Sequence, residues 1–163
     1  MHVAQVTIAD NKVLALVGAI VREKSILIVD DSEQDTTLLR RALKKSNFSS
    51  FVDVVQDGEL AIDYLTATGE FADRAGATLP VVVLLDINLP RVSGIEVLGR
   101  LRRNKLTRML PVVMFTSSDE DCDRQQCYEI GANSYVRKPI AYQDYIDTVH
   151  RLVAYWHDIN LPP

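Results

Sequence analysis

The sequence predicts an α/β domain built on a doubly wound, five-stranded parallel sheet with helices on both faces. Short unbroken apolar runs alternate with amphipathic helical stretches between residues 25 and 156. This alternation is typical of a parallel sheet that is buried on both faces. The chain has 163 residues, which suits one domain with a sizeable core and leaves no room for a second catalytic domain.

Strands and helices are expected to alternate along the chain. Apolar runs predict strands at 25–29, 51–55, 81–85, 111–115 and 134–136. Helical spacing of apolar residues predicts helices at 33–46, 58–67, 93–103, 119–130 and 141–156. Ser32 and Ser118 are suited to cap the helices that follow them, while Gly131 and the pair Asp57-Gly58 mark element ends. Residues 68–79 are expected to form the only long polar connection.

Apolar side chains form one stripe along the last expected helix, and we expect this stripe to pack on the core. The stripe comprises Tyr142, Tyr145, Ile146, Val149, Leu152, Val153 and Trp156. Tyr155 lies off the stripe and is followed by an apolar ending that contains Ile159 and Leu161. Such an ending suggests contact with another surface.

The first 24 residues precede the first expected core strand. Their apolar run, 13–21, is too short to span a membrane, and no basic stretch precedes it as in a signal peptide. Asp10 can cap a helix from Asn11 to about Glu23 that packs on the domain or on a partner; an upstream start or added residues are the alternative. We therefore divide the chain into an N-terminal extension (1–24), a domain (25–156) and a short tail (157–163).

The charge and cysteine content argue against several classes of function. The net charge of -4 and the pI of about 5.3 argue against nucleic-acid binding. The clustered basic residues fall in last turns of expected helices, where they favour the helix dipole: Arg40, Arg41, Lys44, Lys45, Arg100, Arg102, Arg103 and Lys105. Cys122 and Cys127 are spaced so that a disulfide between them is not expected, which favours a reducing cytoplasm. The three histidines are scattered and do not predict a metal site.

Polar side chains follow four of the expected strands. Asp30 and Asp31 follow the first strand, Asp86 the third, Thr116 the fourth and Lys138 the fifth. Because ligands bind at the carboxyl edge of such sheets, we expect these five groups to converge there. Three close carboxylates repel one another unless a cation lies among them, and a hard ion such as Mg²⁺ prefers oxygen ligands.

These groups would support phosphoryl transfer. With a divalent ion and Lys138 beside it, Asp86 can stay ionised and act as a nucleophile. Both cations would neutralise charge that develops on a transferred phosphoryl group, and Thr116 would offer a hydroxyl to one of its oxygens. A single strand-end aspartate is often only a helix cap, but five such groups together favour a functional site.

The motifs resemble those of the receiver domains of two-component response regulators. They are Val29-Asp30-Asp31-Ser32, Leu85-Asp86-Ile87-Asn88-Leu89-Pro90, Gly94, Phe115-Thr116-Ser117-Ser118 and Tyr135-Val136-Arg137-Lys138-Pro139. The resemblance covers about residues 25–156 and implies a flavodoxin-like fold with strand order 2-1-3-4-5.

The same resemblance assigns roles to the site residues. It implies that Asp86 is the phosphoacceptor and that Mg²⁺ is bound by Asp31 directly, by Asp30 through water, by Asp86 and by the Asn88 carbonyl. It further implies that Thr116 and Tyr135 form the switch pair and that Lys138 binds the phosphate. A cis peptide bond before Pro139 is also implied.

A narrower resemblance points to the small response regulators of bacterial and cyanobacterial phytochromes. It rests on 89–94, 115–118, 132–135, Tyr155-Trp156 and Leu161-Pro162. The chain departs from that pattern in its 24-residue leader and in 137–140. The resemblance implies a cytoplasmic histidine kinase partner, with output through protein contacts. We also expect a homodimer through 119–130, 134–136 and 141–156, because two-fold pairs are the commonest assembly.

The kinase is expected to dock beside the first helix, which begins directly after Asp31 at the sheet edge. The more exposed positions expected to choose the partner are Gln34, Asp35, Thr37 and Arg41. Leu38, Leu39, Ala42 and Leu43 are expected to be partly core.

Other functions remain as alternatives. A phosphatase with an aspartate nucleophile would need an acidic residue two positions after Asp86, where the chain has Asn88. A nucleotide or flavin binder is disfavoured because neither a Gly-x-Gly-x-x-Gly nor a Walker lysine motif occurs. A pseudo-receiver that only docks is the remaining alternative, against which Asp86 and Lys138 argue. We therefore expect a signalling protein rather than an enzyme.

Overall fold

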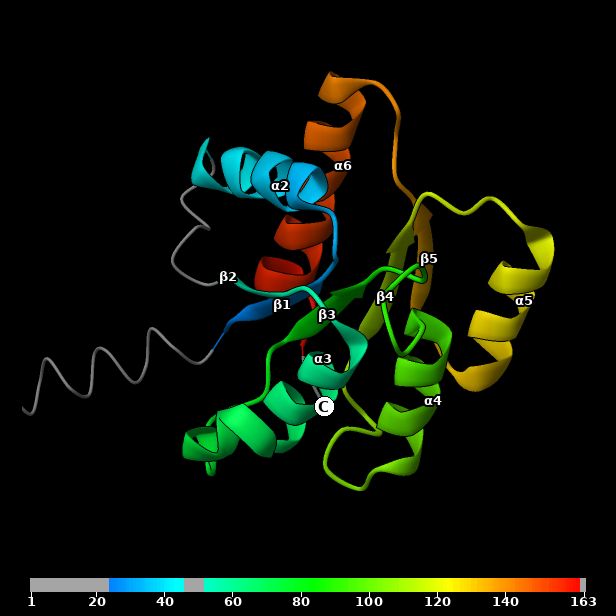
Figure 1. Ribbon diagram of the computed structural model, residues 1–163. Coiled ribbons are helices and arrows are strands. Elements are labelled where there is room, and N and C mark those ends of the chain that lie inside the picture. Colours follow the sequence, from blue (N-terminus) through cyan, green and yellow to red (C-terminus); the bar gives the residue numbers. More distant parts are fainter. Residues whose placement is uncertain (1–23, 46–51, 162–163) are drawn as a thin grey trace, which may run out of the picture.

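A five-stranded parallel sheet runs through the centre of the computed structural model, which describes residues 24–45 and 52–161 (Figure 1). The strands are β1 (Ile26–Val29), β2 (Val52–Val55), β3 (Val82–Leu85), β4 (Val112–Thr116) and β5 (Ser134–Arg137). Their order is β2-β1-β3-β4-β5, and every neighbouring pair is parallel. The predicted fold class and strand order are confirmed.

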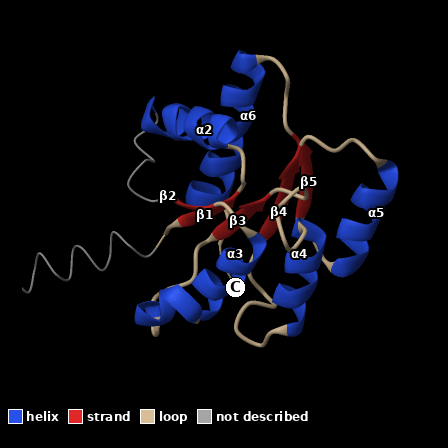
Figure 2. Cartoon of the chain, viewed as in Figure 1, coloured by secondary structure: helices blue, strands red, loops and turns tan. Residues whose placement is uncertain are grey.

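Within the described residues, five α-helices connect or follow the strands and cover both faces of the sheet (Figure 2). They are α2 (Glu33–Lys45), α3 (Gly58–Thr66), α4 (Gly94–Arg103), α5 (Asp121–Ile130) and α6 (Tyr142–Ala154). Helices α2 and α6 lie on one face, and α3, α4 and α5 lie on the other (Figure 1).

The two faces take alternate residues of each strand, because successive side chains of a strand point in opposite directions. Leu27, Val83 and Met114 pack toward α3, α4 and α5, whereas their neighbours Ile28, Leu84 and Phe115 pack toward α2 and α6. Strands β1, β3 and β4 are buried on both sides, which explains why they appear as unbroken apolar runs in the sequence.

The predicted caps are confirmed at some helix ends but not at all of them. The Ser32 hydroxyl accepts a hydrogen bond from the Asp35 N–H at 3.1 Å, and Gly131 ends α5 with a left-handed φ of 115°. Ser118 does not cap α5 directly, because that helix begins at Asp121 with Glu120 as its N-cap. The Ser118 hydroxyl instead donates to Asp123 at 2.8 Å, so it braces the loop before the helix.

The last helix differs from the prediction at both ends. Tyr145, Val149 and Trp156 of the predicted stripe are buried, but Tyr142 is 52% exposed because the first turn of α6 stands clear of the strands (Figure 1). Beyond Ala154 the chain makes a π-helical turn, η3 (Tyr155–Ile159). Tyr155 is exposed, as the stripe predicted.

Two further segments also differ from their prediction. The connection expected to be a plain loop contains a 3-10 helix, η2 (Gly69–Arg74), which packs on α3 through Phe71 and Tyr64. Arg102 does more than favour the dipole of α4, since its guanidinium donates to the carbonyl of Gly131 at 2.8 Å and to Asn133 Oδ1 at 3.0 Å. It thereby ties α4 to the turn before β5.

The N-terminal helix expected at 11–23 lies outside the described residues. Lys24, the first described residue, donates from its ammonium to the carbonyl of His157 at 3.0 Å. Within the described ranges, no helix has the length and apolar character needed to cross a membrane.

Candidate phosphoacceptor site

The backbone places the strand-end residues at one edge of the sheet by extending the strand ladders. The Asp86 N–H donates to the carbonyl of Val29 at 2.9 Å, and the Asp30 N–H donates to that of Val55 at 3.1 Å. The Lys138 N–H donates to the carbonyl of Thr116 at 2.7 Å. Asp30, Asp86 and Lys138 therefore hold fixed positions at the carboxyl edge of the sheet, where the sequence predicted them.

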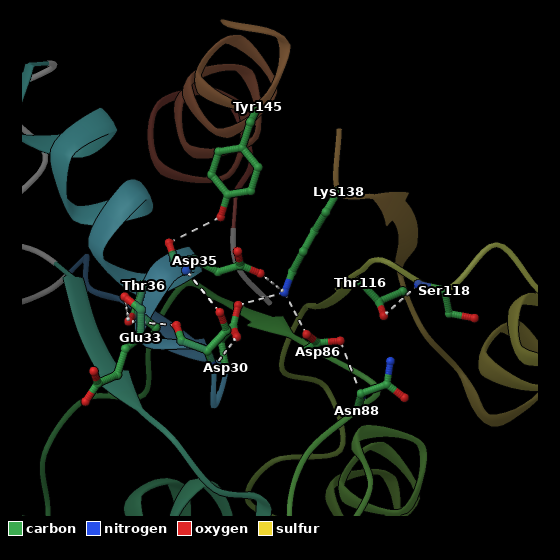
Figure 3. Close-up of polar contacts among 11 residues, drawn as sticks. Asp30, Glu33, Asp35, Thr36, Asp86, Asn88, Thr116, Ser118, Lys138 and Tyr145 are labelled. Carbon is green, nitrogen blue, oxygen red and sulfur yellow. Dashed lines mark hydrogen bonds and ion pairs between the residues drawn. The ribbon is translucent and has the colours of Figure 1, made fainter. Parts of the chain in front are cut away.

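Lys138 lies at the centre of the site and joins three carboxylates (Figure 3). Its ammonium lies 2.6 Å from Asp86 Oδ2, 2.8 Å from Asp30 Oδ2 and 2.8 Å from Asp35 Oδ2. The Lys138 side chain is only 6% exposed, and those of Asp30 and Asp86 are 3% and 7% exposed. The site is therefore a nearly dry cluster of opposite charges.

Burial and charge act in opposite directions on the pKa values of this cluster. Burial disfavours the charged form of Lys138, but the hydrogen bonds to Asp30, Asp35 and Asp86 outweigh it and raise the pKa of the ammonium. Burial also raises the pKa of Asp30, and the contact with Lys138 only partly offsets this. Lys138 is therefore a permanent positive charge beside Asp86 at neutral pH.

Asp31 and Asn88 lie at the exposed rim of the site. Both residues are exposed, and the Asn88 N–H donates to Asp86 Oδ1 at 3.3 Å. The carboxylates of Asp30, Asp31 and Asp86 and the Asn88 carbonyl supply hard oxygen donors, which are the ligands that Mg²⁺ prefers. Within the described ranges, no three acidic, His or Cys residues form a ready metal cluster, and Lys138 bridges Asp30 and Asp86.

The two predicted switch residues, Thr116 and Tyr135, each form a hydrogen bond with the backbone of Ser118 in the loop after β4. Thr116 is fully buried, and its hydroxyl accepts from the Ser118 N–H at 3.3 Å. The Tyr135 hydroxyl donates to the Ser118 carbonyl at 3.1 Å, and burial raises the pKa of this phenol. Both side chains therefore hold the β4–α5 loop in the conformation described here.

Asp35 is the site residue that sequence reasoning missed. It was expected to face a partner, but its carboxylate points toward Lys138 and its side chain is 32% exposed (Figure 3). An acidic residue in the first turn of a helix usually interacts with the helix dipole, so the presence of Asp35 there did not indicate a contact with Lys138. The other expected docking positions, Gln34, Thr37 and Arg41, are exposed as predicted.

The expected cis bond before Pro139 is wrong, because the described residues contain no cis peptide bond. Trans is the more stable isomer even before proline.

The family model of the response regulator receiver domain matches residues 26–150. Among curated proteins, the chain is 36% identical over 138 residues to the probable methanogenesis regulatory protein FilR2 of Methanothrix harundinacea, covering 85% of this chain and 86% of that one. It is 32% identical to the response regulator Rcp1 of Synechocystis, covering 85% of this chain and 93% of Rcp1.

Solved structures give the same family. The Mn²⁺-bound form of Rcp1 matches with a TM-score of 0.78 and 31% identity, over 86% of this chain and 99% of that one. The bacteriophytochrome response regulator RtBRR matches with a TM-score of 0.67 and 42% identity, over 86% of this chain and 84% of that one. With its fold, its acidic edge and these relatives, the chain belongs to the response regulator receiver domain family.

Proposed function

We propose that this receiver domain accepts a phosphoryl group from a histidine kinase onto Asp86 in a Mg²⁺-dependent reaction. The observation that carries the proposal is the contact of the Lys138 ammonium with Asp86 Oδ2 at 2.6 Å in a nearly dry site. Response regulator receiver domains generally act in phosphoryl signalling rather than as enzymes on other substrates.

In this reaction a carboxylate oxygen of Asp86 attacks the phosphorus of the donor. The bond between phosphorus and the imidazole nitrogen of the donor breaks, its electron pair stays with the imidazole, and an acyl phosphate forms on Asp86. Lys138 then donates to a phosphoryl oxygen, and the Thr116 hydroxyl reaches another. No proton needs to leave Asp86, because it reacts as the carboxylate.

Asp31, Asp86 and the Asn88 carbonyl would hold a magnesium ion through their oxygen atoms, and Asp30 would act through water. When bound, the ion supplies positive charge that offsets the charge of the phosphoryl group. A Mn²⁺-bound form is known for the similar protein Rcp1. The Asp30 and Lys138 side chains hold the rest of the site in place.

We further propose that Thr116 and Tyr135 transmit the modification. If Thr116 turns toward the phosphoryl group, its hydroxyl leaves the Ser118 N–H and the loop after β4 can move. Tyr135 also holds that loop through the Ser118 carbonyl, so it would change position with it. The output then passes to a partner through the surface around α5 and β5.

The proposed kinase partner is of the phytochrome type, since RtBRR is a bacteriophytochrome response regulator. The proposed docking surface lies beside α2, where a groove is lined by Glu33, Gln34, Thr37, Leu38, Arg41 and Tyr142. Two free thiols, Cys122 and Cys127, agree with action in a reducing cytoplasm. Contacts in this groove would determine which kinase binds, and they would have less effect on the transfer reaction at Asp86.

Docking can be tested separately from chemistry. Replacing Gln34, Thr37 and Arg41 together by the residues of an unrelated receiver should slow transfer from the cognate kinase. Labelling by a small phosphodonor should be unchanged, because the site residues are untouched. If both donors lose activity equally, the substitutions have damaged the site and the docking surface lies elsewhere.

We also propose a homodimer through α5, β5 and α6. Exposed apolar side chains occur on α5 and on the segment after α6, with Tyr128 50%, Tyr155 48% and Leu161 88% exposed. Sedimentation equilibrium at micromolar concentration should show a dimer that Tyr155→Ser weakens. A strict monomer with and without phosphorylation would refute this proposal.

The reaction itself is tested by incubating the chain with a small-molecule phosphodonor and weighing the intact protein. One phosphoryl group should be gained with Mg²⁺ and none with a chelator. No gain in either condition would favour the pseudo-receiver alternative, while continuous release of inorganic phosphate from simple esters would favour a phosphatase.

A further inference from the structure

Asp35 contacts Lys138 but has no part in the proposed transfer reaction. It lies in the first turn of α2, and its Oδ2 is 2.8 Å from the Lys138 ammonium. Its side chain is 32% exposed, against 3% for Asp30 and 7% for Asp86. Of the three carboxylates on Lys138, Asp35 is thus the one that remains partly in water.

The position of Asp35 is fixed by its neighbours. Its N–H donates to the Ser32 hydroxyl at 3.1 Å, which anchors the start of α2 directly after the acidic pair. Its carbonyl accepts a long hydrogen bond, 3.5 Å, from the Tyr145 hydroxyl of α6. The backbone of Asp35 is therefore held from two elements, which places its carboxylate within reach of the Lys138 ammonium.

The hydrogen bonds of Lys138 are fully used. An ammonium has three N–H donors, and each one here has a carboxylate acceptor. Two of those acceptors belong to Asp30 and Asp86, the carboxylates that the proposed function also gives to Mg²⁺, Asp86 directly and Asp30 through water. The ion and Lys138 therefore compete for the same two carboxylates.

We propose that Asp35 is a positioning residue that holds the Lys138 ammonium while Asp30 and Asp86 turn to the divalent ion. This inference rests on the proposed function and deepens it. Lys138 is buried, so it cannot give up both Asp30 and Asp86 unless another anion compensates its charge. Asp35 is that anion, and it therefore raises the affinity of the site for Mg²⁺.

The through-space attraction between an acidic residue and a cation has to be separated from the contact of Asp35 with Lys138. Any acidic residue near the site attracts a cation through space, whether or not it contacts Lys138. Glu33 provides the matched control, because it lies in the same turn of α2, is exposed, and points away from Lys138 (Figure 3). Glu33→Gln removes the same charge without removing a Lys138 contact.

The experiment is calorimetric titration of the full chain with MgCl₂. Asp35→Asn should weaken Mg²⁺ binding about tenfold, the usual size of one charged hydrogen bond, whereas Glu33→Gln should weaken it less than about twofold. Asp35→Glu should restore most of the affinity. In a Lys138→Met background the effect of Asp35→Asn should fall below about twofold, because the competing ammonium is gone.

The outcomes separate this inference from the proposed function. Equal weakening by Asp35→Asn and Glu33→Gln, or equal loss with Lys138 and with Met at position 138, would overturn the role of Asp35. If Lys138→Met does not fold by circular dichroism, the comparison of Asp35→Asn, Asp35→Glu and Glu33→Gln decides alone. Failure of the unaltered chain to bind Mg²⁺ would overturn the proposed function, and this inference with it.

Discussion

Gly94 lies so close to Asp86 that a Cβ at position 94 would be 1.9 Å from the Asp86 carbonyl oxygen. The Gly94 N–H also donates to the Ile87 carbonyl at 2.9 Å, so the start of α4 is joined to the segment that follows the phosphoacceptor. No side chain fits there unless this segment moves. The glycine is therefore part of what fixes the position of Asp86.

Gly94→Ala should lower the free energy of unfolding by about 2 kcal/mol, since it forces an atom into a packed backbone contact. It should also slow labelling by a phosphodonor, because Asp86 would shift. Urea unfolding and intact mass measure the two effects. Gly99→Ala is the matched control: its Cβ would come no closer than 3.4 Å to the flexible end of Arg103, so it should be neutral or slightly stabilising.

Asp57 should make stability depend on pH. Its carboxylate accepts from the Glu59 N–H at 2.7 Å and from Arg91 Nε at 2.7 Å. Burial opposes its charge, but these hydrogen bonds outweigh burial and lower its pKa. A carboxyl whose pKa is lower in the folded state stabilises the protein above its unfolded pKa of about 3.9, and this stabilisation is lost as pH falls through the folded value.

Asp57→Asn keeps the oxygen that caps α3, but it removes the charge and the oxygen that accepts the hydrogen bond from Arg91 Nε. At neutral pH it should cost about 1 kcal/mol of unfolding free energy, a modest value because Arg91 is largely exposed. The difference from the unaltered chain should shrink as pH falls below about 4. Urea unfolding across that range measures it, and a difference that stays constant would contradict the assigned charge effect.

The two cysteines should react at very different rates. Cys122 is exposed, whereas Cys127 is fully buried and burial raises its pKa to about 11. Only thiolates react with disulfide reagents, so one thiol should be fast in the folded chain and the other should wait for unfolding. Cys122→Ser should remove the fast phase, which absorbance of the released reagent would show. A fast phase that survives would mean that Cys127 is accessible.

The sequence predicted the sheet and its edge because both depend on short-range patterns. Strands β1, β3 and β4 are buried on both faces, so each is visible as an apolar run, and the residue after each run falls at the carboxyl edge. Asp30 and Asp86 could therefore be grouped from the sequence, whereas Lys138 follows β5, which is only partly buried. In a parallel sheet the carboxyl ends of neighbouring strands lie at the same edge, so these residues were expected to lie close together.

The missed features depend on contacts between distant segments. Asp35 meets Lys138 across 103 positions, and Arg102 meets Asn133 across 31. Both are charged residues on amphipathic helices, where the pattern predicts solvent exposure but not the partner of a charged group. Tyr142 was assigned to the core by its spacing alone, and spacing does not show where a helix passes the end of the strands.

The most direct test of the account is the chemical position of the phosphoryl group. After labelling with a small phosphodonor and Mg²⁺, borohydride reduction converts a phosphorylated aspartate to homoserine, which peptide mass spectrometry locates. The account predicts homoserine at position 86, and no phosphoryl gain in Asp86→Asn. Homoserine at position 30, 31 or 35, or full labelling of Asp86→Asn, would contradict the assignment of Asp86 as the phosphoacceptor.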